Sequence, residues 1–482
     1  MINSKNKFIA TIVFAILVVG ITFRLYNLNI ENFWIDEMVT FWVTDPLITI
    51  SETINRNIES DLHFFFNLVL KIYFSFTSYE INLARYLPAT LSVLTILSIF
   101  YLSIILKTKN YLFLLFLTSF NIYLIKYAQE LRSYSLIVFL TSVSLIFFFK
   151  ITDKNNDKKN LITFFFIISQ ILIVLTHIYG LIIIFSFIIF DFLTYYKFKE
   201  KNIYLHISNL ICGVTSFIFL IIYLKNISHT VDWFPKLELK FFTNFYFSKF
   251  FGSRLLGLLH LMLLIYLIVK SRIWFLKKYD QRLILILIII FSYLVPISYS
   301  MIIKPILQDK YIIFVLIPVL VLTSNLINLI ENHLFRKIVI SLTIFLTIGN
   351  LFTETTVRQF FSKRIIYKPD LKSTFIEINK SNYKNYSFNL EKGNWTSEKT
   401  LNDILKNYSK KYTNQINIKL TYVDYKNNGK MIKNNSNFLW LVCLHDINGR
   451  SCLIPKNFDN VQIIREENYN SVNLKLLKFL KI

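Results

Sequence analysis

Long apolar segments recur along this chain, separated by short polar segments that contain lysine and arginine. A helix needs about 18 or more mostly apolar residues to cross a bilayer, and the pattern predicts about eleven such helices. They are expected near residues 8–24, 86–106, 111–127, 133–149, 161–176, 178–195, 203–224, 254–269, 283–303, 311–330 and 337–353. The apolar run 161–195 is too long for one helix, so we divide it at Thr176–Gly180 (THIYG).

The first apolar run, Phe8–Phe23, follows Lys5 and Lys7 and resembles a signal peptide. Gly20–Arg24 (GITFR) contains no small-x-small cleavage site, and further spans follow. We therefore interpret this run as a retained signal anchor.

The distribution of lysine and arginine predicts the orientation in the membrane. With the N-terminus in the cytoplasm, the short cytoplasmic loops are the ones rich in cations, as the positive-inside rule requires. They are Lys107–Lys109, Lys150–Lys159, Lys197–Lys201, Lys270–Arg282 and Arg336–Lys337. We expect a multi-pass protein of the inner (plasma) membrane, with the first loop, 25–85, and the C-terminal segment on the extracytoplasmic side.

The first outer loop contains an apolar stretch and an acidic pair. Leu62–Phe76 is apolar but is interrupted by His63, Asn67 and Lys71, which favours an interfacial helix over a span. Asp36 and Glu37 follow the first span directly. The predicted transmembrane domain covers residues 1–353.

After about residue 353 the composition changes to asparagine, lysine, serine and tyrosine, and residues 354–482 are expected to form one small α+β domain outside the membrane. Alternating stretches at 415–422 and 461–464 predict strands. Asn448-Gly449 between 438–444 and 451–455 predicts a hairpin. That hairpin would bring Cys443 near Cys452, and an exported domain permits a disulfide there. The fold class is thus a polytopic α-helical membrane protein with a C-terminal α+β extracytoplasmic domain.

Composition supports this class. The chain has 482 residues, of which 54% are hydrophobic and 17% charged, with a net charge of +24. Lysines in cytoplasmic loops account for the positive charge, and no basic stripe is interleaved with stacking aromatic residues on a soluble module. We expect the membrane, and no nucleic acid, among the partners.

Several polar side chains are expected together at the outer ends of the spans. They are Asp36, Glu37, His63, Glu130, Arg132, His177 and Lys310. A carboxylate within reach of a hydroxyl can act as a general base, and arginine or lysine can stabilise a departing phosphate. The same residues also have simpler interpretations: a solvated acidic pair, an ion pair of Glu130 with Arg132, an interfacial histidine, a helix cap and a snorkelling lysine.

The order of the motifs resembles the GT-C superfamily of polyprenyl-phosphate-sugar glycosyltransferases, in the branch of the protein mannosyltransferases and the lipid A aminoarabinose transferase. The resemblance covers residues 1–350. Its motifs are Trp34–Glu37 (WIDE), Asp61–Phe65 (DLHFF), Arg85–Ala89 (RYLPA), Tyr127–Tyr134 (YAQELRSY), Thr176–Gly180 (THIYG) and Lys310-Tyr311 with Pro318.

The resemblance implies an inverting transfer of a sugar from a polyprenyl-phosphate donor to a hydroxyl of a lipid, glycan or protein acceptor. Asp36 and Glu37 are the implied catalytic residues, with Asp36 as base. The implied residues for substrate and lipid phosphate are His63, Arg85, Glu130, Arg132, Tyr134, His177, Lys310 and Tyr311. No cofactor is certain; a divalent metal ion is possible, with Glu37, His63 and His177 as candidate ligands.

Two positions depart from the family pattern. His63-Phe64-Phe65 stands where the family has His-Pro-Pro, and Lys310 stands where it has arginine. Lysine keeps the charge but not the bidentate geometry.

A transporter or flippase of lipid-linked sugars is the alternative, and an inactive assembly partner is a third hypothesis. The transporter predicts ionisable residues in mid-membrane and paired Gly/Pro-broken helices, whereas this chain has 9 Gly and 8 Pro.

Overall fold

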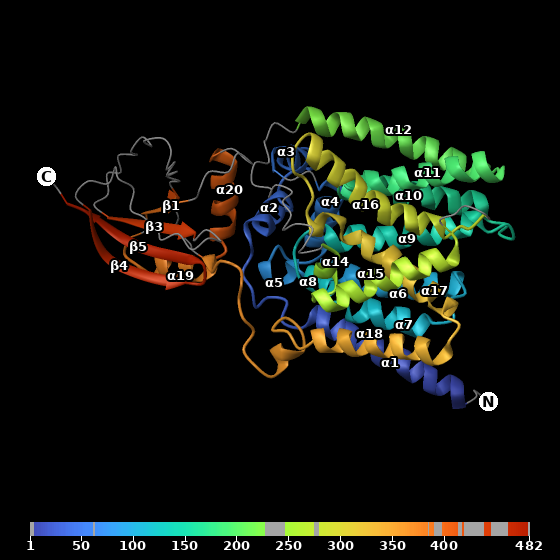
Figure 1. Cartoon of the computed structure of the whole chain (residues 1–482). Coiled ribbons are helices and arrows are strands. Elements are labelled where there is room, and N and C mark those ends of the chain that lie inside the picture. Colours follow the sequence, from blue (N-terminus) through green and yellow to red (C-terminus); the bar gives the residue numbers. More distant parts are fainter. Residues whose placement is uncertain are drawn as a thin grey trace.

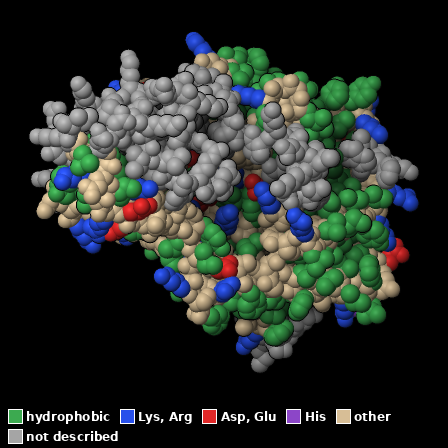
Figure 2. All heavy atoms as spheres, turned by 60° about the vertical axis from the view of Figure 1, so that its left-hand side comes forward, with side chains coloured by type: hydrophobic (Ala, Val, Ile, Leu, Met, Phe, Trp, Pro, Cys, Tyr) green, Lys and Arg blue, Asp and Glu red, His purple; other side chains and the backbone are tan. Residues whose placement is uncertain are grey.

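The computed structural model describes residues 4–60, 63–226, 246–273, 279–383, 385–389, 398–412, 417–418, 438–444 and 461–480. Figure 1 shows a helix bundle with a small sheet domain at one end, and the two termini at opposite ends of the molecule. Figure 2 shows hydrophobic side chains spread over the bundle, while charged side chains gather near the sheet domain.

The bundle and the segments between its helices form most of the chain. Its elements are α1 (Ser4–Leu25), α2 (Ile35–Val43), α3 (Ile50–Ser60), α4 (Phe64–Phe76), α5 (Ile81–Ala84), α6 (Tyr86–Ile105), α7 (Tyr111–Phe120), α8 (Ile122–Ala128), α9 (Tyr134–Thr152), α10 (Lys159–Thr176), α11 (Gly180–Phe198), α12 (Ile203–Asn226), α14 (Tyr246–Phe250), α15 (Arg254–Ser271), α16 (Leu283–Ile302), η1 (Asp309–Val315), α17 (Leu316–Leu326), η2 (Ile327–Leu329) and α18 (His333–Asn350).

Within the described residues, nine helices are long and apolar enough to cross a membrane, and the bent pair α7–α8 makes ten. The chain is a multi-pass membrane protein. The eleventh expected span corresponds to α18, which lies along the bundle but is not among those nine. The spans Tyr134–Thr152 and Asp309–Leu329 are the most buried and form the centre, whereas α1 and α12 lie at the periphery.

The expected straight span 111–127 is instead two helices that meet at Asn121 with a bend of 50°. The bend leaves the carbonyl oxygens of Thr118 and Ser119 without partners inside α7. Arg24 of α1 is fully buried and donates to both oxygens, at 3.1 and 2.8 Å. Buried backbone carbonyls need such partners in a medium without water, so Arg24 stabilises the bend.

The C-terminal part contains η3 (Val357–Phe360), α19 (Leu371–Lys380), β1 (Asn385–Asn389), α20 (Glu398–Ser409), β2 (Asn417–Ile418), β3 (Phe438–Leu444), β4 (Val461–Tyr469) and β5 (Val472–Phe479). The strands form one mixed sheet in the order β2-β1-β3-β5-β4. β1 runs parallel to β2 and β3, while β5 runs antiparallel to β3 and β4. Phe375 of α19, Tyr408 of α20 and Trp440 of β3 are buried in its core.

The Asn448-Gly449 turn and residues 451–455 of the predicted hairpin lie outside the described residues, so that hairpin stays a prediction. β3 lies inside the sheet, and both of its edges pair with other strands, β1 on one side and β5 on the other. The strand at 461–464 is confirmed as the start of β4, and the strand at 415–422 is described at Asn417–Ile418. Cys443 is disulfide-bonded. Cys452 lies outside the described residues, so its pairing with Cys443 stays a prediction.

Candidate active site

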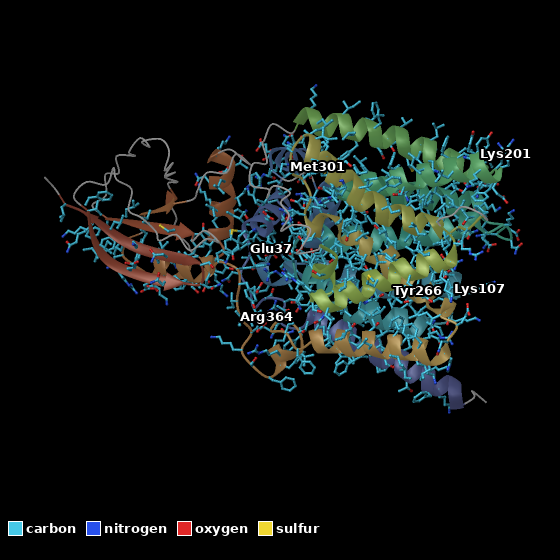
Figure 3. All side chains as sticks on the ribbon, in the orientation of Figure 1. Glu37, Lys107, Lys201, Tyr266, Met301 and Arg364 are labelled. Carbon is cyan, nitrogen blue, oxygen red and sulfur yellow. The ribbon has the colours of Figure 1, made fainter. Side chains whose placement is uncertain are left out.

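The acidic pair lies at the end of the bundle that faces the sheet domain. Asp36 and Glu37 are in the first turn of α2, where the helix dipole favours negative charge. The Glu37 carboxylate accepts the backbone N–H of Trp34 at 3.0 Å and thereby satisfies a donor at the helix start. Figure 3 shows Glu37 at this end, and Lys107 and Lys201 at the opposite end, as the predicted orientation requires.

Glu37 is completely buried, and both of its oxygens are occupied by protein donors. Oε1 accepts from Arg85 Nε at 2.9 Å and from the N–H of Leu131 at 2.8 Å. Oε2 accepts from Arg85 Nη2 at 2.9 Å and from Lys368 Nζ at 2.7 Å. Sequence reasoning missed Lys368. The Glu37 carboxylate thus joins three other segments of the chain, and its expected roles in catalysis and metal binding stay predictions.

Arg85 also bonds to several other parts of the chain. Its guanidinium donates to Glu37 and to the backbone oxygens of Leu28, Glu31 and Asn32, so all of its N–H groups are used inside the protein. The side chain is buried. Arg85 therefore holds the loop before α2, and its expected contact with the substrate or lipid phosphate stays a prediction.

The ion pair makes stability depend on pH. Burial alone would raise the pKa of Glu37, but the charges of Arg85 and Lys368 outweigh it and hold that pKa well below its usual range. The unfolded chain binds this proton near pH 4.3, the approximate ordinary glutamate pKa. The pair thus stabilises the fold above about that pH, and its contribution decreases as the pH falls further.

We expect the melting temperature in detergent to fall as the pH is lowered from about 7 to about 3, with part of the fall due to Glu37. Glu37→Gln should be less stable at neutral pH and should lose less on acidification. If the melting temperatures of the two proteins fell by the same amount as the pH is lowered, Glu37 would not be the titrating group.

Asp36 is the exposed member of the pair. Its side chain is 33% exposed, and its Oδ2 lies 3.6 Å from Lys310 Nζ, at the start of η1. The ammonium group is thus near the carboxylate without a hydrogen bond that closes it off. This arrangement leaves the carboxylate of Asp36 accessible to the hydroxyl of a molecule that binds here.

Arg132 connects α2 to His63. It donates to the backbone oxygen of Asp36 at 3.1 Å and to Thr40 Oγ1 at 3.2 Å, and Nη2 lies 3.1 Å from His63 Nε2. A guanidinium can only donate, so Nε2 accepts and Nδ1 carries the proton. Nδ1–H then donates to the backbone oxygen of Thr176 at 3.0 Å. His63 thus connects Arg132 to the C-terminal end of α10.

Aromatic rings line the other side of the Lys310 ammonium. Lys310 Nζ lies 5.8 Å from the ring centre of Tyr134 and 5.7 Å from that of Tyr311, within cation–π range. The His177 ring lies 5.1 Å from Tyr311 and 5.1 Å from His63. Most of the predicted site residues therefore meet in one cluster.

The tight turn between α10 and α11 places His177. Gly180 is required there, because a β-carbon would lie 2.8 Å from the backbone oxygen of Ile173. His177 Nδ1 accepts the N–H of Tyr179 at 3.2 Å, as the helix-cap interpretation predicted. Glu130, on the turn between α8 and α9, is half-buried, and its backbone oxygen accepts the N–H of Arg132 at 2.8 Å.

The predicted metal ligands do not form a ligand set. Among the described residues, no three His, Cys, Asp or Glu side chains are grouped to hold a metal ion. The Glu37 oxygens face cations, His63 Nε2 faces Arg132, and His177 Nδ1 accepts a backbone N–H.

The fold resembles solved transferase structures at low sequence identity. ArnT from Cupriavidus metallidurans in the apo state matches with a TM-score of 0.60 and 10% identity over 98% of each chain. The same protein bound to undecaprenyl phosphate matches with a TM-score of 0.55 and 9% identity, again over 98% of each chain. The oligosaccharyltransferase of Archaeoglobus fulgidus, in complex with Zn and sulfate, gives 0.52 and 11% over 89% of this chain and 67% of that chain.

No protein-family model matches the chain, and no curated protein matches it in sequence. The chain shares the fold of these structures, as the resemblance predicted. Identities near 10% show the fold alone, so the activity has to be argued from the cluster.

Proposed function

We propose that this chain is an integral-membrane inverting glycosyltransferase that moves a sugar from a polyprenyl-phosphate donor to a hydroxyl acceptor. One observation carries the proposal: a partly exposed carboxylate, Asp36, lies 3.6 Å from the ammonium of Lys310, and Arg132 donates to the backbone oxygen of the same residue. A base and cations for a leaving phosphate thus occupy one end of the bundle. The structure of ArnT with undecaprenyl phosphate supports the donor class by fold.

The reaction needs one bond formed and one broken. The acceptor oxygen attacks the anomeric carbon of the sugar, while the bond from that carbon to the phosphate oxygen breaks. The phosphate leaves with the electron pair as polyprenyl phosphate, and the acceptor proton goes to Asp36 Oδ. Attack opposite the leaving group inverts the anomeric configuration.

Lys310 has a role in this scheme. Before the donor binds, its ammonium group lies 3.6 Å from the Asp36 carboxylate. During transfer it offsets the charge that develops on the departing phosphate. The Tyr134 and Tyr311 rings beside it leave the ammonium less hydrated, which strengthens its attraction to an anion.

Arg132 mainly positions the site. Its bonds to the Asp36 backbone, Thr40 and His63 fix the first turn of α2 relative to α9 and α4. Both are elements of the bundle, so Asp36 is held on a rigid frame. The acceptor is a lipid, glycan or protein hydroxyl on the outer side of the inner membrane.

The donor half of the proposal is tested by binding of undecaprenyl phosphate to the purified protein. Lys310→Met should weaken binding about tenfold to hundredfold, since a hydrogen bond to a charged group contributes about 1.5–3 kcal/mol. Lys310→Arg should restore most of it. Lys304→Met, in the same loop, is the matched control and should bind like wild type. Equal affinity of Lys310→Met and wild type would remove Lys310 from the phosphate site.

A further inference from the structure

The segment between η3 and α19 lies against the loop that precedes α2. Three of its side chains, Arg364, Lys368 and Asp370, contact residues of that loop, of the first turn of α2 or of the turn before α9. Figure 3 shows Arg364 near Glu37 at the boundary between bundle and sheet domain. These contacts are not required to neutralise Glu37, because Arg85 already pairs with both of its oxygens.

Lys368 connects the C-terminal part of the chain to the helix that carries Asp36. Its Nζ donates to Glu37 Oε2 at 2.7 Å and lies 4.0 Å from Glu31 Oε2. The same Glu37 oxygen accepts the N–H of Trp34, the residue at which α2 begins. Glu37 and Asp36 are adjacent in the first turn of α2. A shift of the Lys368 side chain, which is bonded to Glu37, therefore also shifts this turn.

Two further bonds tie the segment to the same region. Arg364 Nη1 donates to Gln129 Oε1 at 3.1 Å, on the turn that leads to Arg132. Asn32 Nδ2 donates to Asp370 Oδ1 at 2.5 Å, and Asp370 also caps α19 through Ser373. The segment therefore contacts both the loop that leads to Asp36 and the turn that leads to Arg132.

The sheet domain holds this segment in place. Asn470, in the turn between β4 and β5, donates to the backbone oxygens of Ile366 at 2.8 Å and Lys368 at 2.9 Å. The Asn470 backbone oxygen accepts the N–H of Asp370 at 2.9 Å. A continuous path of bonds thus runs from the β4–β5 turn through Lys368 to Glu37.

We propose that Lys368 is a positioning residue for the reaction, and that the C-terminal sheet domain sets the orientation of Asp36 through the path Asn470–Lys368–Glu37. This inference rests on the proposed function, because it assigns the domain a part in the same site. Lys368 touches neither the donor nor the acceptor in this scheme. It fixes the start of α2, where a shift of about 1 Å in a base can cost about a hundredfold in rate.

The test compares Lys368→Met, Lys368→Arg and Asn470→Ala with wild type. Lys363→Met is the matched control, since Lys363 lies in the same segment but is exposed. Hydrogen exchange of peptides covering residues 31–40 is measured in the full-length protein, together with the melting temperature and the transfer rate. Exchange reports on α2 even if no donor has been found.

We expect faster exchange at residues 31–40 in Lys368→Met and Asn470→Ala, and no change in Lys363→Met. The maximal transfer rate should fall about tenfold or more in both variants, while the affinity for undecaprenyl phosphate stays unchanged. In Lys368→Arg the transfer rate should recover. Unchanged exchange at 31–40 in both variants would overturn the inference. Faster exchange in a protein that transfers no sugar would leave the positioning contact standing and count against the proposed function instead.

Discussion

Replacing Asp36 by asparagine should lower the rate of sugar transfer by a factor of about 10²–10⁴, the usual contribution of a positioned general base. Asparagine keeps the size of the side chain but cannot take the acceptor proton. Asp36 is 33% exposed and makes its ion pair with a partly exposed lysine, so the fold does not depend on its charge. The loss should therefore appear in the maximal rate.

The measurement is the single-turnover rate at saturating donor, together with the affinity for undecaprenyl phosphate and the melting temperature. Asp45→Asn is the matched control: Asp45 lies in the same outer loop, and its Oδ1 accepts a backbone N–H that an asparagine oxygen can also accept. It should transfer at the wild-type rate. An Asp36→Asn protein that turns over like Asp45→Asn would exclude Asp36 as the base.

The second large effect concerns stability. Arg85→Met should destabilise the protein by about 3–5 kcal/mol, because removing one member of a buried ion pair leaves the other charge without its main partner. The side-chain exposure of the pair is 2% for Arg85 and 0% for Glu37. Three backbone oxygens in the loop before α2 also lose their donor.

The comparison for this effect is Arg358→Met, which breaks the ion pair of Arg358 with Glu354. The Arg358 side chain is 55% exposed, so its loss should cost less than about 1 kcal/mol. Unfolding in denaturant or by heat in detergent gives both values. Similar losses in the two variants would mean that the Glu37–Arg85 pair does not hold the loop.

Much of the fold could be predicted, because a long run of apolar residues in the sequence indicates a membrane-spanning helix. Each of the eleven expected positions is helical in the structure, and the turn at Thr176–Gly180 separates α10 from α11 as expected. The bend at Asn121 could not be predicted in the same way. The bend depends on Arg24 of α1, which donates hydrogen bonds to the two backbone carbonyls of α7 that the bend leaves without partners in that helix.

The site was predictable where residues follow spans directly. Asp36, Arg132 and Lys310 each lie at the end of a helix on the same side, and topology alone brings them near one another. Which carboxylate of the pair stays exposed was not predictable, since adjacent residues of a helix face different directions.

Lys368 was missed because it is 331 residues from Glu37, and no local pattern marks such a contact. The pairing of β3 with β1 and β5 was missed for a related reason, because it is decided by tertiary structure rather than by local propensity.

In the proposed reaction, this protein cleaves a polyprenyl-phosphate sugar. The most direct measurement places the purified protein in lipid vesicles with a panel of polyprenyl-phosphate sugars and hydroxyl acceptors. Mass spectrometry follows the release of polyprenyl phosphate, with Asp36→Asn as the background. We predict that at least one donor is cleaved by wild type and not by Asp36→Asn above background. Lipid-linked sugar that crosses the bilayer intact, with no polyprenyl phosphate released from any donor, would contradict the account and favour a transporter.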